Sequence, residues 1–537
     1  MKNKKMKKIF LYAFAITAAI IGVQSCSTYY FRSNYKDANR LIYETNNLQT
    51  KPFLKAHLKN GDVCILKDSW KIDTALSMVT GYGTQFDFNR RQRDEGLISI
   101  PIDSVAIFET NTKILNPEFN RITALSLMAG LDVALGITCL TNPKVCFGSC
   151  PTFYLNENDN FHYADAEGFS NAISPSLEYF DIDALNHKLI TDNTLSVTMK
   201  NEALETHCVK DVKILAHPLK EGERVFHSPT NDFYLCENLY MLKQAEGEEG
   251  DITDYLKHDD KLERFSLSDS NNLSSKEEIY LTFDNVTNTN NLGFIISFRQ
   301  TLMTTYFIYS AMGYMGDEVG DFFAKVETVE KINAKLGIGI KEELGDIDIY
   351  IWSNQKNDWE FQNGFYETGP IAVNRQLIPL KNSNSGSEIK AKIVLNKGLW
   401  RIDHVALTNI KDKVIPLELS PSSVYNKGKI DSTALSQIKS SDEYLVSMPG
   451  SEYKFNFMFP GANTYYELFL YSKGYYLEWV REQWIKDKDL LKLKKLLNNP
   501  KKYLHDEAKV YKLYENTMEQ EFWNSRIDTK TFSYYDK

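Results

Sequence analysis

The stretch Asn201–Cys208 holds the densest group of side chains suited to acid–base or metal chemistry. Glu205 and His207 are two positions apart, so on a strand both side chains lie on one face. There they could share a proton or a metal ion. A hydrogen-bonded network at a strand edge needs the same residues, and we expect that structural role. Glu202, Glu205 and His207 therefore form a weak candidate site.

Two other acidic pairs carry little more information. Asp346 and Asp348 share a face of a predicted strand, where they could bind calcium or simply be solvated. Asp403 and His404 are adjacent on a strand, so regular alternation sends them to opposite faces. The sequence lacks the G-x-S-x-G, HExxH, Walker A and dinucleotide-binding motifs. It predicts no catalytic residue, cofactor or metal ligand set and favours a non-enzymatic role.

The cysteines are better suited to disulfides than to zinc. Three of them form a C-x6-C-x3-C cluster, Cys139, Cys146 and Cys150, which lacks the paired C-x2-C spacing of zinc sites. We predict a loop disulfide between Cys146 and Cys150. Cys208 and Cys236 are further disulfide candidates, since an oxidising compartment allows such pairing.

The first 26 residues predict a lipoprotein signal peptide. Residues 1–25 contain five lysines and no acid, and the run from Ile9 to Val23 is apolar and uncharged. Fifteen residues fall short of the roughly 20 that a permanent membrane span needs. The sequence Val23-Gln24-Ser25-Cys26 resembles a loose lipobox, which predicts that Cys26 is lipidated, with palmitate-type acyl chains anchoring the protein. The alternative is an ordinary secretory signal with an incidental cysteine.

The residues after Cys26 bear on the location of the anchor. Ser27 stands where an aspartate would favour retention in the inner membrane, so the outer membrane is favoured. Residues 27–31 lack the acidic cluster of surface-exported lipoproteins. We expect an outer-membrane lipoprotein that faces the periplasm rather than the cell surface.

Composition predicts a folded, acidic body of several domains. The chain is 43% hydrophobic and 13% aromatic, enough for sizeable cores. Its net charge is −9, and removing the five lysines of residues 1–25 brings the mature protein to about −14. This charge argues against a nucleic-acid partner and against a polybasic membrane surface.

The pattern of strands and helices predicts an α+β, strand-rich, multi-domain fold. Alternating runs dominate the first and third quarters of the chain, and the C-terminus is helical, with helices expected over 475–497 and about 503–523. The predicted parts are a signal peptide (1–25), a tether (26–50), a small N-terminal β module (51–118), an apolar helix (119–144), a central mixed α/β domain (145–333), a β-sandwich-like domain (334–437), and C-terminal strands and helices (438–537).

Two of these segments suggest interactions. Residues 122–140 carry one charge, Asp132, and predict a helix that is buried between modules or, alternatively, associated with a membrane. The predicted sandwich contains Trp352, Trp359 and Tyr366, which we expect in its core or, if exposed, as a binding surface.

Several stretches resemble an uncharacterised family of Bacteroidetes-type envelope lipoproteins. The motifs that carry the likeness are NPKVCFGSCPTFY (142–154), NEALETH (201–207) and SKGYYLEW (472–479), and they are spread over most of the mature chain. No activity comes with this resemblance, which implies only a shared location and architecture.

These observations favour a lipid-anchored envelope protein that acts as a scaffold or binding module for a protein or glycan partner. Two alternatives remain. The protein could belong to a membrane assembly that uses the 122–140 helix, or it could be an enzyme acting on envelope polymers. The enzyme hypothesis requires a cleft that gathers Glu202, Glu205 and His207 with other polar groups.

Overall fold

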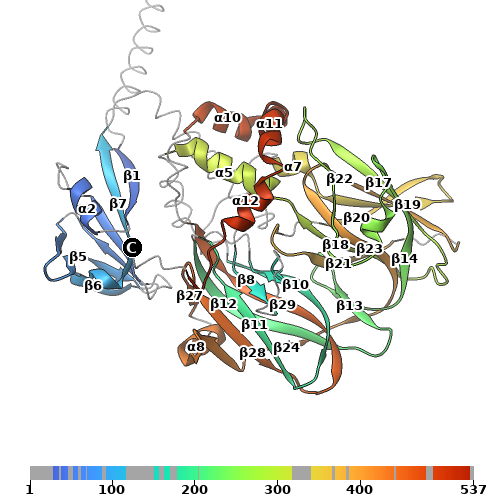
Figure 1. Cartoon of the computed structure of the whole chain (residues 1–537), viewed down its shortest axis with the longest axis horizontal. Coiled ribbons are helices and arrows are strands. Elements are labelled where there is room, and N and C mark those ends of the chain that lie inside the picture. The colour runs from blue at the N-terminus through green and yellow to red at the C-terminus, as the bar shows by residue number, and fades with distance from the viewer. Residues whose placement is uncertain are drawn as a thin grey trace, which may run out of the picture. The chain divides into compact units, whose positions relative to one another are not determined.

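A computed structural model describes most of the chain as two compact units, and each is treated by itself here (Figure 1). The described residues are 28–35, 38–45, 52–58, 62–67, 69–86, 92–115, 150–155, 163–169, 178–203, 205–316, 340–365, 369–381, 386–440, 443–478 and 488–531. Cys26 and the segments 119–144 and 479–487 lie outside them. Within the described residues, no helix is both long and apolar enough to span a membrane.

The N-terminal unit is a small antiparallel sheet with one helix. The strand order is β1-β7-β2-β3-β5-β4, and β6 pairs with β5. Its elements are β1 (Thr28–Tyr35), α2 (Ala38–Thr45), β2 (Phe53–Leu58), β3 (Val63–Leu66), β4 (Lys71–Asp73), β5 (Met78–Phe86), β6 (Gln92–Pro101), a 3-10 turn (Ile102–Ser104) and β7 (Val105–Leu115).

This unit begins earlier than the sequence predicts. Residues 28–35 were expected to be a tether, yet they pair with β7 along their whole length, from Thr28 opposite Leu115 to Tyr35 opposite Phe108. The helix α2 also lies within the range predicted as a tether. The tether prediction is wrong because these residues form an edge strand whose stability comes from a partner about 80 positions away.

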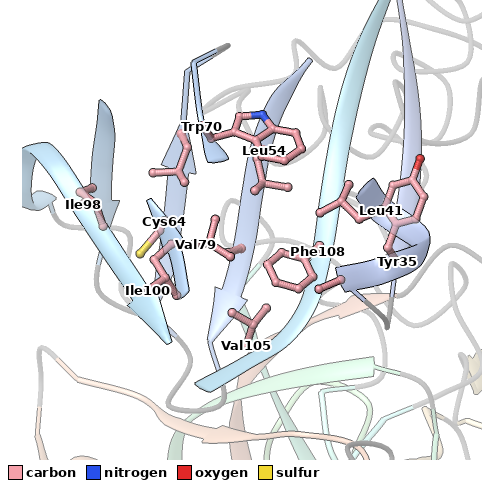
Figure 2. Close-up of a cluster of buried hydrophobic side chains, with 13 residues drawn as sticks. Tyr35, Leu41, Leu54, Cys64, Trp70, Val79, Ile98, Ile100, Val105 and Phe108 are labelled. Carbon is pink, nitrogen blue, oxygen red and sulfur yellow. The ribbon is translucent and has the colours of Figure 1, made fainter. Parts of the chain in front are cut away.

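One face of this sheet buries a compact hydrophobic core under α2 (Figure 2). Trp70 is 1% exposed, and Leu41, Leu54 and Leu66 are completely buried. The Trp70 indole Nε1 donates a hydrogen bond to the Pro52 carbonyl at 2.8 Å, so its polar atom is satisfied inside the core. The core therefore contains a large side chain from a connection as well as residues from the strands.

The second unit contains three sheets, and the largest has eleven strands. Its order is β16-β23-β18-β21-β13-β14-β17-β22-β19-β20, with β15 paired to β14. Its strands are β13 (Arg224–His227), β14 (Phe233–Gly247), β15 (Gly250–Asp251), β16 (Arg264–Phe265), β17 (Lys276–Phe283), β18 (Leu292–Gln300), β19 (Ile347–Ser353), β20 (Asp358–Phe365), β21 (Asn374–Pro379), β22 (Ile389–Asn396) and β23 (Trp400–Val414).

Part of this sheet closes on itself. An additional pairing between β14 and β23 joins β23, β18, β21, β13 and β14 into a ring. The ring has a small apolar interior with one residue from each strand: Phe226, Cys236, Ile295, Leu377 and Ala406. The strands β17, β22, β19 and β20 extend from β14 as an open sheet.

The other two sheets combine strands from distant parts of the chain. One has the order β10-β29-β12-β24 with β27 on β12, and the other has the order β26-β25-β28-β11-β8-β9. Their strands are β8 (Thr152–Tyr154), β9 (Ala166–Glu167), β10 (Tyr179–Ile190), β11 (Thr194–Lys200), β12 (Glu205–Pro218), β24 (Leu417–Leu419), β25 (Ser423–Asn426), β26 (Lys429–Ile430), β27 (Leu445–Ser447), β28 (Glu452–Met458) and β29 (Thr464–Glu478).

The helices of this unit are short. They are α4 (Thr253–Leu256), α5 (Met303–Met315), α7 (Ile340–Leu344), α8 (Ser432–Lys439), α10 (Leu490–Asn498), α11 (Pro500–Tyr514) and α12 (Met518–Asn524). The expected α+β, strand-rich fold with a helical C-terminus is confirmed. The boundary predicted at residue 334 does not separate two domains, because strands from both sides of it alternate within the eleven-stranded sheet.

The first C-terminal helix also differs from its prediction. Residues 475–478 belong to β29, which pairs with β12 across 13 residue pairs, and α10 begins only at Leu490. The Asp489 carboxylate caps α10 by accepting from the amides of Leu491 and Lys492. The predicted helix starts too early because the pairing of residues 475–478 with β12 depends on the tertiary structure, which helical spacing within 475–497 does not reveal.

Candidate functional site

An aromatic cluster covers one face of the open sheet β17-β22-β19-β20. On β19 the side chains alternate strictly between buried and half-buried positions, and Tyr350 and Trp352 occupy the half-buried face. The antiparallel register places Tyr350 opposite Phe361 and Trp352 opposite Trp359 on β20. We call the five aromatic residues of this surface the aromatic face; they are Tyr280, Tyr350, Trp352, Trp359 and Phe361.

Each of the five rings contacts at least one other: Tyr280, Trp352 and Trp359 form a trio around Trp359, and Tyr350 and Phe361 form a pair. The ring centroids of Trp352 and Trp359 are 5.4 Å apart, those of Tyr350 and Phe361 are 5.5 Å apart, and those of Tyr280 and Trp359 are 5.8 Å apart. The Tyr350–Phe361 and Trp352–Trp359 planes are inclined by 64° and 74°, the edge-to-face geometry that aromatic quadrupoles prefer, whereas the Tyr280–Trp359 pair is tilted by 53°. The contacts stabilise the positions of the rings in the absence of a ligand.

A lysine lies in the middle of the cluster. Lys392 on β22 is paired with both Tyr280 and Tyr350 in the strand register. Its ammonium nitrogen lies 5.2 Å from the centroid of Tyr350 and 5.4 Å from that of Trp359, within cation–π range. It also forms an ion pair with Glu278 at 2.9 Å. Glu278 thus compensates the charge of Lys392, and the lysine side chain lies between the rings of Tyr350 and Trp359.

The aromatic face is unusual for the solvent side of an antiparallel sheet. Such a side is normally polar, whereas here Phe361 is 49% exposed and Tyr280 is 43% exposed. Tyr350, Trp352 and Trp359 are half-buried. Contiguous exposed apolar surface of this kind marks sites of interaction. Of the three aromatics singled out from the sequence, Trp352 and Trp359 lie here, and Tyr366 falls outside the described residues.

The structure brings together only two of the three residues of the weak candidate site, Glu205 and His207. Glu205 and His207 lie on the same face of β12, as predicted, with 3.1 Å between Oε2 and Nε2. Both are fully buried, and the His207 ring packs edge-on against Tyr476. Glu202 points elsewhere and accepts hydrogen bonds from Thr152 at 2.7 Å and Tyr154 at 2.6 Å. The geometry is that of buried structural hydrogen bonding, and it does not form the cleft that the enzyme hypothesis requires.

The cysteines form no disulfide among the residues that the structure describes. Cys150, Cys208 and Cys236 are each buried, as is Cys64. Burial raises the pKa of Cys236 to about 12. Burial and then neighbouring carboxylates, of which Glu167 is the first, also raise the pKa of Cys150. Such thiols are poor nucleophiles. Cys139 and Cys146 lie outside the described residues, so the Cys146–Cys150 disulfide stays a prediction.

The acidic pair on β19 does not build a metal site. The pKa of the Asp348 carboxyl is raised by burial and then by Asp346, opposed by Lys276. No group of three or more His, Cys, Asp or Glu side chains within the described ranges is arranged to hold a metal ion. Asp348 is better described as part of the polar border of the aromatic face.

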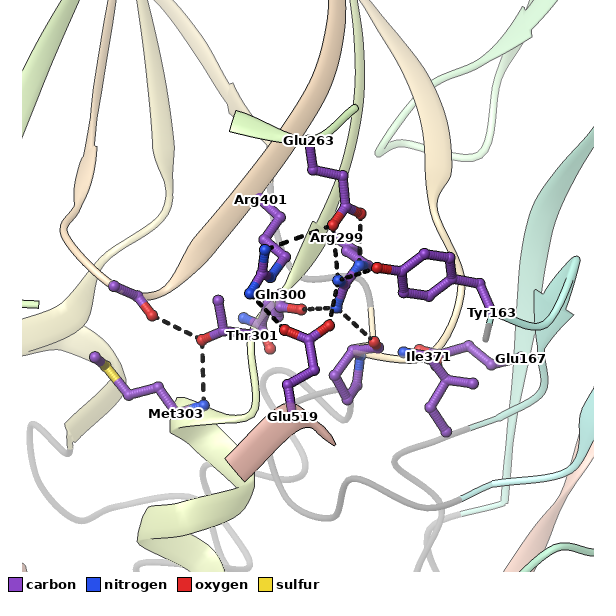
Figure 3. A network of polar contacts seen from close by, with 12 residues as sticks. Tyr163, Glu167, Glu263, Arg299, Gln300, Thr301, Met303, Ile371, Arg401 and Glu519 are labelled. Atoms are coloured by element: carbon purple, nitrogen blue, oxygen red, sulfur yellow. Dashed lines mark hydrogen bonds and ion pairs between the residues drawn. The ribbon is translucent and has the colours of Figure 1, made fainter. Parts of the chain in front are cut away.

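A buried ionic network centres on Arg299, near the end of β18 (Figure 3). Its guanidinium donates to the Glu263 carboxylate at 2.6 and 2.7 Å, to Glu519 on α12 at 2.5 Å and to the Pro370 carbonyl at 3.1 Å. The Tyr163 ring lies 4.6 Å from the guanidinium carbon. The network joins segments that are far apart in the sequence, which is a structural role.

Neither the aromatic face nor this network was identified from the sequence as a set. An arginine at the end of the apolar run Leu292–Phe298 was a usable signal for the network, because a buried guanidinium requires carboxylate partners. Comparison with known protein families and with curated proteins finds no match for this chain. The resemblance to envelope lipoproteins stays a prediction from its motifs.

Proposed function

We propose that this protein is a lipid-anchored envelope protein that binds a neutral glycan through the aromatic face. The observation that carries the proposal is the group of five aromatic side chains, each in contact with at least one other, on a sheet surface where polar residues are the norm. Aromatic rings stack on the apolar C–H faces of sugars, and neighbouring polar groups bind the hydroxyls.

The charges around the face support a neutral rather than an anionic ligand. Lys392 is paired with Glu278 at 2.9 Å, Lys356 with Glu360 at 2.7 Å, and Lys390 with Glu388 at 3.7 Å. A surface that binds an anionic polymer, such as a nucleic acid or a polyuronate, needs an excess of cationic side chains. With these three lysines compensated, the surface offers mainly rings and hydrogen-bonding groups, although Lys381 also lies 5.9 Å from the ring centroid of Phe361.

Affinity electrophoresis in gels that contain neutral polysaccharides, namely dextran, xylan or mixed-linkage β-glucan, tests the proposal. We expect at least one of them to retard the mature protein, whereas polygalacturonate does not. Trp359→Ala removes a ring that contacts two others. Truncating such an aromatic anchor costs about 2 kcal/mol, or roughly a 30-fold weaker affinity.

A matched pair of tyrosine variants provides the control. Tyr280 is 43% exposed on the aromatic face, and Tyr465 is 52% exposed on β29. Tyr280→Ala weakens binding and Tyr465→Ala leaves it unchanged. Equal binding by both variants, or retardation by polygalacturonate alone, would contradict the proposal.

The anchor has its own test. Replacing Cys26 by serine removes the thiol that receives the acyl chains, so the protein moves from the membrane fraction to the soluble periplasmic fraction. Labelling with an alkyne analogue of palmitate is lost at the same time. Ser27→Ala keeps Cys26 and serves as the control, remaining labelled and membrane-bound. A Cys26→Ser protein that still sediments with membranes would exclude lipidation as the anchor.

A further inference from the structure

The strand register arranges the residues of the aromatic face in rows that cross the sheet. Tyr280 on β17 pairs with Lys392 on β22. Lys392 pairs with Tyr350 on β19, which in turn pairs with Phe361 on β20. Directly paired residues of antiparallel strands have their side chains on the same side of the sheet. These four residues therefore form one row across four strands, which we call the central row.

The rows on either side of the central row hold fewer rings. On one side, the paired residues of β17, β22 and β19 are Glu278, Val394 and Asp348, none of which is aromatic. On the other side, Trp352 pairs with Trp359 on β19 and β20, but β17 carries a threonine. Of these three rows, only the central row has rings at both of its ends.

Lys392 joins the trio and the pair of rings into one surface. Its ammonium nitrogen lies 5.4 Å from the ring centroid of Trp359 and 5.2 Å from that of Tyr350. The Trp359 ring also contacts Tyr280, with 5.8 Å between the centroids, and Tyr350 contacts Phe361 at 5.5 Å. An unbroken series of side-chain contacts thus runs from one end of the central row to the other.

The aromatic face is about twice as long across the strands as it is along them. The four neighbouring strands span three strand spacings, or about 14 Å. Along β20, Trp359 and Phe361 are two residues apart, which is about 7 Å. The two most exposed rings, Tyr280 at 43% and Phe361 at 49%, stand at the ends of the long direction. A chain-like ligand therefore gains the most contact when it lies across the strands.

The length of the central row restricts the class of glycan that fits it. A pyranose ring is about as wide as one aromatic side chain, so a single sugar covers one ring of the row. A ligand that contacts Tyr280 and Phe361 together needs several sugars in an extended line. Equatorial linkages, as in xylan and mixed-linkage β-glucan, keep a chain extended and present the apolar C–H faces of its sugars. The axial linkages of dextran turn the chain away from a straight line.

Polar side chains stand beyond both ends of the central row. Glu246 on β14 pairs with Tyr280, and the Lys381 ammonium nitrogen lies 5.9 Å from the ring centroid of Phe361. Both side chains are exposed, so a longer chain can pass them while its hydroxyl groups form hydrogen bonds with them. This arrangement suits the interior of a chain better than its terminal sugar.

We propose that the central row binds the interior of an extended, equatorially linked neutral glycan, which lies across β17, β22, β19 and β20 from Tyr280 to Phe361. Because the row is part of the glycan-binding surface proposed above, this specificity rests on that proposed function. It adds the class of chain, its direction on the sheet and the need for several consecutive sugars.

Isothermal titration calorimetry of the mature protein tests the length of the site, with the disaccharides, tetrasaccharides and hexasaccharides of the cello- and xylo-oligosaccharide series. In at least one series we expect affinity to rise by about tenfold or more from the disaccharide to the tetrasaccharide, because the longer chain reaches a second exposed aromatic anchor. Phe361→Ala removes one end of the row, so this gain falls to about threefold or less. Tyr465→Ala, on a strand of a different sheet, retains the full gain.

Affinity electrophoresis tests the class of linkage. We expect xylan or mixed-linkage β-glucan to retard the protein more strongly than dextran does. A disaccharide that binds as tightly as the hexasaccharide, an unchanged gain in Phe361→Ala, or stronger retardation by dextran would each overturn this specificity while leaving glycan binding itself intact. If none of the neutral polysaccharides retards the protein, the proposed function fails and this specificity fails with it.

Discussion

Replacing Arg299 by methionine lowers the free energy of unfolding of the second unit by about 3–5 kcal/mol, which is the cost of breaking a buried ion pair from one side. Arg299 is completely buried, and the Glu263 side chain is only 4% exposed. Methionine fills the space of the stem but leaves Glu263 and Glu519 without their main partner. Their negative charges then face each other in a poorly solvated site.

The neighbouring Arg401 offsets only part of this loss. It contacts Glu519 at 2.5 Å but lies 3.8 Å from Glu263. Urea denaturation followed by circular dichroism measures the change. The control is Lys243→Met, which breaks an exposed ion pair with Asp284 and leaves the midpoint almost unchanged. A similar small effect for Arg299→Met would show that the network does not hold β18 and α12 together.

The second large effect is expected in the N-terminal unit. Trp70→Ala removes the largest side chain of its core, which is 1% exposed, and lowers the stability of this unit by about 3–5 kcal/mol. The backbone limits any collapse around the cavity. A Cβ atom on Gly83 would lie 2.0 Å from the Ile65 carbonyl oxygen, so β3 and β5 are already at their closest approach.

Amide hydrogen exchange in β3 and β5 reports on this unit separately. The expected loss corresponds to a fall in protection of at least about a hundredfold. Tyr82→Ala, at a position on β5 that is 60% exposed, changes stability by no more than about 0.5 kcal/mol. If Trp70→Ala and Tyr82→Ala behaved alike, the indole would not be the centre of this core.

The sequence alone identified the elements whose side chains alternate against a buried face. The run 346–352 was predicted as a strand and is found as β19, with buried and half-buried residues in strict alternation. The helix expected over about 503–523 is found as two helices, α11 and α12. Local periodicity is sufficient to predict a strand such as β19, because the alternation of apolar and polar residues itself shows which face is buried.

The tertiary structure decided which of these elements meet. The local sequence does not predict that β1 pairs with β7, or that β29 lies between β10 and β12. The aromatic face has the same origin, because Tyr280 and Trp359 are 79 positions apart and meet only through the order of four strands. Strand order depends on the packing of the whole core, which the spacing within a segment cannot encode.

Asp403 shows the same division within one strand. Its sequence places it in a strand, as found, but the bulge at this position depends on the register with β18. Arg299 is similar, since its partners come from a connection and from a C-terminal helix. The sequence by itself determined the strand-rich α+β character of the chain, because alternation and composition are local properties. Only the tertiary structure decided the aromatic face and the Arg299 network, because each requires side chains from segments that pairing and burial bring together.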